Sequence, residues 1–171
     1  MPNIGLVLTL AAAVVCMPVH AAETAAPACP AHAAPLPAPW TAWAKPQPAK
    51  SFDTATPSGF LSLDTAYDVT LFPIDKVSFA LQPGKPIPLD RFGGVFALAV
   101  PHAAKVGIAL SDGAWIDVIN GDTAEATLEH GHGPDCSGIR KIVWFDLKDG
   151  IYRIQIEGAP KGSIRFMAVV K

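Results

Sequence analysis

Apolar and polar residues alternate with a period of two along most of the chain after Ser51. Residues 152–157 show this clearly, because Tyr152, Ile154 and Ile156 alternate with three polar side chains, and residues 164–170 repeat the pattern. This period predicts strands with one buried and one solvated face. Seven earlier segments are predicted as strands on the same grounds: 67–72, 77–81, 94–100, 104–110, 114–119, 123–130 and 140–147.

Short turn sequences separate several of these segments. Asp112-Gly113, Asn120-Gly121 and Asp149-Gly150 are expected to supply the positive φ angles that tight hairpins require. The segment 142–147 is apolar on both faces, so we expect it to lie centrally or to carry an outer docking surface. Short strands at this spacing predict an all-β fold, an antiparallel β-sandwich or jelly roll of about eight to nine strands.

The first 50 residues follow a different pattern. Residues 1–22 hold an unbroken apolar stretch, then Pro18 and small residues, which predicts a signal peptide cleaved after Ala21 or Ala22. Residues 23–50 are rich in Ala and Pro and predict an extended, polyproline-like arm. One or both of Trp40 and Trp43 are expected to dock on the domain that follows, residues 51–171. The protein is therefore expected to be periplasmic or secreted.

Charge and hydropathy narrow the possible partners. The formal net charge is −2, without the clustered Lys and Arg that nucleic-acid binding requires, so no nucleic-acid partner is expected. No stretch after the signal peptide is apolar enough to predict a transmembrane segment. The sequence leaves the identity of a small ligand or protein partner open.

Two cysteines remain after signal cleavage, Cys29 in the arm and Cys136 in a Gly-rich loop. In an oxidising compartment such a pair predicts a disulfide. The bond would fix the arm beside the loop.

The Gly-rich loop also carries the strongest candidate chemistry. His130 and His132 are two residues apart, so on an extended backbone both imidazoles project to the same face. A copper or zinc site is one hypothesis, with His130, His132 and Asp135 as ligands. Further ligands could come from Cys136, His32 and Cys29, although a disulfide would remove both thiolates. No Gly-x-Ser-x-Gly sequence favours a serine hydrolase.

A second kind of site is predicted from aromatic and basic side chains. Trp115 and Trp144 lie on strands and are candidates for partly exposed ligand platforms, with core packing as the alternative. Arg140 follows the loop and could hold an anionic ligand.

Two family resemblances arise from particular segments. The residues at 113–117, at 130–141 (His-Gly-His-Gly-Pro-Asp-Cys-Ser-Gly-Ile-Arg-Lys) and at 149–152 resemble a group of small exported proteobacterial proteins often named homogentisate 1,2-dioxygenase. That name implies a ring-opening non-haem iron enzyme, with iron held by His130 and His132 and completed by Asp135 or His102. More loosely, the final Gly-x-Tyr strand pair is similar to bacterial pre-peptidase C-terminal domains, which are β-sandwiches attached to secreted enzymes.

Three functions follow as hypotheses. The first is an exported β-sandwich of binding or accessory type, with metal binding through the His-Gly-His loop as its sharper form. The second is the iron dioxygenase that the resemblance implies. The third is a non-catalytic module that binds a partner protein or a glycan. The sequence favours a non-catalytic protein over the dioxygenase hypothesis.

Overall fold

The computed structural model describes Cys29 and residues 35–171. The predicted signal peptide and His32 lie outside these residues. The described chain forms strands and two short 3-10 helices: η1 (Trp40–Ala44), β1 (Gln47–Lys50), β2 (Phe60–Leu61), β3 (Ala66–Thr70), β4 (Phe72–Pro73), η2 (Ile74–Lys76), β5 (Phe92–Val100), β6 (Ala104–Leu110), β7 (Trp115–Asn120), β8 (Thr123–Ala124), β9 (Thr127–Gly131), β10 (Lys141–Leu147), β11 (Gly150–Ala159) and β12 (Ser163–Val170).

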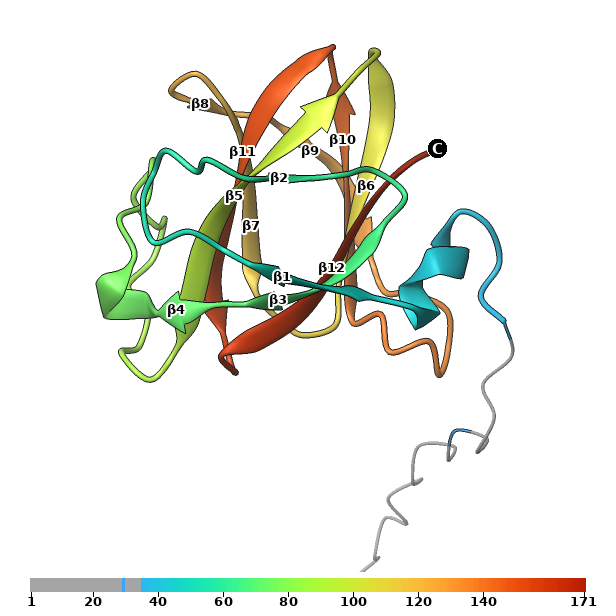
Figure 1. Ribbon diagram of the computed structural model, residues 1–171, viewed down its shortest axis with the longest axis horizontal. Coiled ribbons are helices and arrows are strands. Elements are labelled where there is room, and N and C mark those ends of the chain that lie inside the picture. The colour runs from blue at the N-terminus through green and yellow to red at the C-terminus, as the bar shows by residue number, and fades with distance from the viewer. Residues whose placement is uncertain (1–28, 30–34) are drawn as a thin grey trace, which may run out of the picture.

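The strands form two sheets that pack face to face (Figure 1). Sheet A has the order β1-β3-β12-β6-β10-β9, and sheet B has the order β2-β5-β11-β7-β8 with β4 also paired to β5. The predicted all-β sandwich is confirmed. The sheets are mixed rather than wholly antiparallel, because β1 pairs with β3 and β2 pairs with β5 in parallel.

The main core lies between the two sheets. The rings of Phe96 and Phe166 meet edge to face with their centroids 4.7 Å apart. Val143, Phe145 and Leu147 of β10 point into the same core. Burial of each such side chain stabilises the fold by about 1.5–3 kcal/mol, which explains the alternation along the strands.

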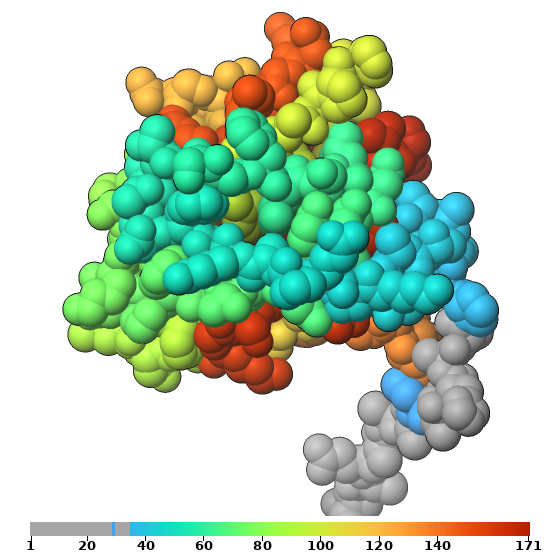
Figure 2. Space-filling view, viewed as in Figure 1, coloured from blue at the N-terminus to red at the C-terminus, as the bar shows by residue number. Residues whose placement is uncertain are grey.

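A second apolar cluster covers the outer face of sheet A. Helix η1 places the indoles of Trp40 and Trp43 there, both buried, against Ile142 and four further strand residues, Ala66, Ala109, Met167 and Val169. Figure 2 shows the η1 residues, in light blue, packed at the side of the sandwich. This cluster explains why β10 is apolar on both faces.

Trp144 closes the edge of this cluster. Its ring meets Trp40 edge to face at 6.1 Å and lies over Gly107 of the neighbouring strand. A Cβ atom at position 107 would come within 2.6 Å of the Trp144 ring, so only glycine fits beneath it.

Three of the predicted strands need correction. Residues 77–81 alternate Val, Ser, Phe, Ala, Leu but form part of an irregular loop after η2. Their backbone is held by a side chain instead of a strand, since Gln155 Oε1 accepts from Ala80 N at 2.9 Å. The predicted strands 67–72 and 123–130 each split in two, and each half joins a different sheet. The described residues include no helix with the length and hydropathy to span a membrane.

Candidate functional site

The loop that carries the two histidines lies at the edge of sheet A. His130 belongs to the edge strand β9 and pairs with Val143, whose side chain is in the main core. His132 follows the strand, and its Nδ1 lies 2.7 Å from the Arg140 carbonyl oxygen and 2.8 Å from Arg140 Nη1. Either contact occupies Nδ1, so only Nε2 of His132 remains as a metal ligand.

The predicted disulfide is present in the same loop. Cys29 is bonded to Cys136 across a sequence separation of 107, with their Cα atoms 5.4 Å apart. Neither sulfur is a thiolate, so neither Cys29 nor Cys136 can serve as a metal ligand while the disulfide is formed.

His130, His132 and Asp135 remain as the candidate metal ligands. Within Cys29 and residues 35–171, no three His, Cys, Asp or Glu side chains come close enough together to hold a metal ion. The metal site stays a prediction from sequence, and the same holds for an iron site with these ligands. His32 is outside the described residues.

The three residues predicted to form a ligand surface, Trp115, Trp144 and Arg140, do not lie on one common surface. Trp144 is on β10 in sheet A, where it packs beside the arm. Arg140 is exposed and contacts His132. Trp115 is on β7 in sheet B and is 61% exposed. Of the three, only Trp115 borders the apolar groove described below.

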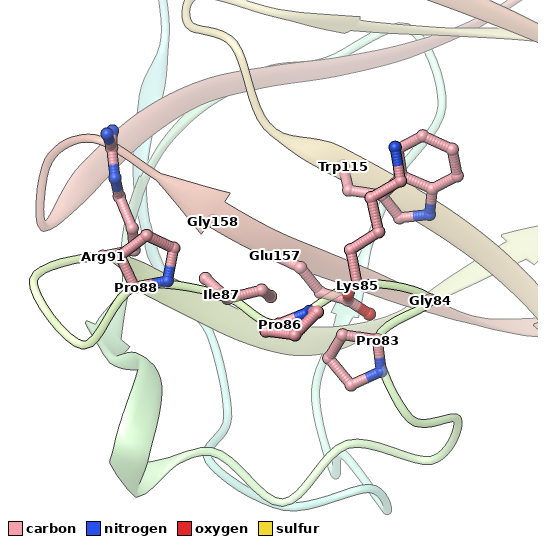
Figure 3. Close-up of a pocket in the computed structure, with 10 residues that line it drawn as sticks. All are labelled: Pro83, Gly84, Lys85, Pro86, Ile87, Pro88, Arg91, Trp115, Glu157 and Gly158. Atoms are coloured by element: carbon pink, nitrogen blue, oxygen red, sulfur yellow. The ribbon is translucent and has the colours of Figure 1, made fainter.

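This groove, of about 450 Å³, lies between the outer side of sheet B and a proline-rich loop, residues 83–88. Figure 3 shows Trp115 at one end, Arg91 at the other and Glu157 between them. The lining residues come from the loop, β7 and β11: Pro83, Gly84, Lys85, Pro86, Ile87, Pro88, Arg91, Trp115, Glu157 and Gly158.

The indole of Trp115 is fixed in place although it is exposed. Its Nε1 donates to Asp117 Oδ1 at 2.9 Å, two residues along the same strand. On the ring face, Lys141 Nζ lies 5.4 Å from the centroid, within cation–π range. A large exposed apolar ring held in this way is suited to contact a ligand without losing much side-chain freedom on binding.

Glu157 is the unexpected member of the groove. The alternation along β11 predicts a solvated face for Gln155 and Glu157, but they are 0% and 2% exposed, because the loop after η2 covers them. Gln155 Nε2 donates to Leu81 O at 2.8 Å and also to Glu157 Oε1. Burial is the main cause that raises the pKa of Glu157, the Gln155 hydrogen bond opposes it and the Asp117 carboxylate adds to it, so that the pKa reaches about 7.

Replacing Glu157 by glutamine is therefore expected to remove a pH dependence of stability. A carboxyl whose pKa rises from 4.5 to about 7 on folding stabilises the fold fully below pH 4.5, and this contribution is lost as the pH rises through about 7. The free energy of unfolding should fall by about 2–3 kcal/mol more in the wild type than in Glu157→Gln between pH 5 and pH 8. Urea unfolding at both pH values measures this difference. An equal change in the free energy of unfolding with pH for the two proteins would contradict the raised pKa of Glu157.

The loop opposite Trp115 offers more hydrogen-bond acceptors than donors. Pro83, Pro86 and Pro88 have no backbone N–H, so this wall offers carbonyl acceptors and few donors. With the Glu157 carboxylate at the floor, the groove favours a ligand that donates several hydrogen bonds.

The fold and the groove together define a two-sheet, all-β domain with an aromatic-walled surface groove. No protein-family model matches the chain, and no curated protein matches it either. Among solved structures, the pre-peptidase C-terminal domain of a collagenase from Bacillus anthracis is similar, with a TM-score of 0.41 and 13% identity over 68% of this chain and 95% of that chain. A likeness this weak carries no statement about function. The homogentisate 1,2-dioxygenase name finds no support in these comparisons.

Proposed function

We propose that this protein is an exported, non-catalytic binding module that holds a glycan in the groove between Trp115 and the proline-rich loop. The observation that carries the proposal is the exposed but fixed indole of Trp115 beside a groove with a buried carboxyl at its floor. An aromatic face packs against the C–H face of a sugar ring, and sugar hydroxyls donate to the acceptors beside it.

The dimensions and composition of the groove support this ligand class. Its volume of about 450 Å³ lies within the usual range for small-molecule sites. Its walls are mainly apolar, with few polar groups, which is the composition that fixes a ligand's orientation while burying most of its surface.

Export is part of the proposal and is supported by the disulfide. Cys29–Cys136 is compatible with an oxidising compartment outside the cytoplasm. The signal peptide predicted at residues 1–22 agrees with this location, and so does the arm that follows it. Periplasmic rather than fully secreted placement remains a prediction.

Isothermal titration calorimetry against soluble oligosaccharides, with cellohexaose and chitohexaose as probes, tests the proposed function. At least one oligosaccharide is expected to bind, and Trp115→Ala should weaken that binding tenfold or more, since loss of the ring removes both stacking and buried area. Glu157→Gln should weaken it less.

Ile151→Ala is the matched control. Ile151 is an equally exposed apolar residue on β11, at the end of the strand away from Glu157 and outside the groove. Its replacement should leave the affinity unchanged. Unaltered affinity in Trp115→Ala would move the site elsewhere, and binding of proline-rich peptides in place of sugars would favour a partner-protein module.

A further inference from the structure

A second, smaller cavity of about 280 Å³ lies at the edge between the two sheets and is also lined by Trp115. It is formed where β7 of sheet B approaches β9 and β10 of sheet A, two strands that no backbone ladder joins to β7. Two residues from each strand line it: Trp115 and Ile116, Thr127 and His130, and Lys141 and Val143.

Lys141 is the unusual residue of this cavity. Five of the Lys and Arg residues in the described chain are half-buried rather than exposed. Four of them lie within 4.0 Å of a carboxylate: Arg91 with Asp90, Lys105 with Glu129, Arg153 with Asp122 and Arg165 with Asp68. Lys141 is the fifth, and no carboxylate of the described residues lies that close to its Nζ.

The remaining contacts of Lys141 do not replace a counter-ion. Its Nζ donates to the Ala114 carbonyl oxygen at 3.0 Å and lies over the Trp115 ring. Burial lowers the pKa of Lys141, and the more distant Asp117 carboxylate only partly offsets this. Removing a cation from water without a paired anion is unfavourable, so the position favours an anion that arrives with a ligand.

Neighbouring side chains add hydrogen-bonding groups on the same cavity wall. His130 pairs with Val143 across β9 and β10, which places its ring on the inner side of the edge strand. Within the described residues, neither the His130 ring nor the Thr127 hydroxyl makes a hydrogen bond. Ile116 and Val143 supply the apolar part of the wall.

We propose that this cavity binds a small organic carboxylate. The carboxylate group is held by Lys141 Nζ, with His130 and Thr127 as further donors, and the apolar body packs against Ile116 and Val143. A volume of about 280 Å³ is just below the usual range for ligand sites, which limits the ligand to a small acid rather than a peptide or lipid. Trp115 borders both sites, but Lys141 and His130 do not line the groove and Glu157 does not line the cavity, so variants of Lys141 test this inference apart from the glycan proposal.

Ligand-detected NMR on the full mature protein tests the inference, with isobutyrate and benzoate as probes and their uncharged amides as chemical controls. The acids are expected to bind in the millimolar range, and the amides at least tenfold more weakly, because they lack the charge that Lys141 pairs with. The fluorescence of Trp115 should change on addition of acid.

Variants locate the binding. Lys141→Met keeps the side-chain stem that packs in the wall and removes the charge, and it should weaken acid binding at least tenfold. Lys141→Arg should retain most of it, and His130→Ala should lose several-fold. Lys148→Met, at an exposed lysine just after β10, is the matched control and should bind as the wild type does.

Three results would overturn the inference. They are equal binding of acids and amides, unchanged acid binding in folded Lys141→Met, and absence of acid binding at concentrations up to about 20 mM. Circular dichroism of each variant separates loss of the fold from loss of the site. A result on sugars in the groove, in either direction, leaves these outcomes unaffected.

Discussion

Replacing both Cys29 and Cys136 by serine is expected to lower the free energy of unfolding by about 4–5 kcal/mol. The bond closes a loop with a sequence separation of 107, and a closed loop of that length restricts the unfolded chain far more than the folded one. Chemical denaturation without reductant, comparing midpoints and slopes, measures the loss.

The two single variants provide the internal control. Each removes the same bond, so Cys29→Ser and Cys136→Ser should each match the double variant rather than add to it. Wild-type protein in reductant should behave in the same way. A double variant with the wild-type midpoint would show that the fold does not depend on this link.

Replacing Trp43 by alanine is the second large effect, expected at about 3–5 kcal/mol of lost stability. Trp43 is 2% exposed and lies in the cluster outside sheet A. Arg165 stacks on its ring at 5.8 Å and donates to its carbonyl oxygen, while the same guanidinium binds both oxygens of Asp68. Loss of the ring therefore leaves a cavity and removes the surface on which Arg165 stacks, which loosens the ion pair between Arg165 of β12 and Asp68 of β3.

Trp115→Ala is the control that shows whether the loss of stability comes from the burial of Trp43 or from the loss of any tryptophan ring. It removes the same ring from a position that is 61% exposed, so stability should change by about 1 kcal/mol or less. Thermal unfolding followed by circular dichroism compares the two. Equal destabilisation by both replacements would mean that the arm contributes little packing.

Much of the fold could be predicted from local pattern. The alternation at residues 152–157 and 164–170 correctly predicts β11 and β12, and Asp149-Gly150 correctly marks the turn before β11. Segment 77–81 was predicted wrongly as a strand. Its backbone N–H groups at Ala80 and Leu81 donate to the side chain of Gln155, about 75 residues away along the chain, and not to a neighbouring strand. A local pattern cannot show that a distant amide replaces a neighbouring strand.

The candidate sites show the same limit. Cys29 and Cys136 could be paired from cysteine number and compartment alone, and Trp115 could be identified as an exposed aromatic residue. Glu157 could not be recognised, since in sequence it occupies a polar position on a strand and only the loop folded over it makes it buried. The alternation of polar and apolar residues around it was the one available signal, and it predicted an exposed side chain.

The position of β12 has a consequence for how the chain acquires its structure. This strand follows all the other described strands in sequence, yet it lies in the interior of sheet A, between β3 and β6. Until residues 163–170 have left the ribosome, the strands β3 and β6 lack the strand that joins them, so sheet A cannot be completed before β12 has been synthesised. Such non-local pairing is characteristic of slow folding, and the nascent chain spends that interval with unpaired strand edges.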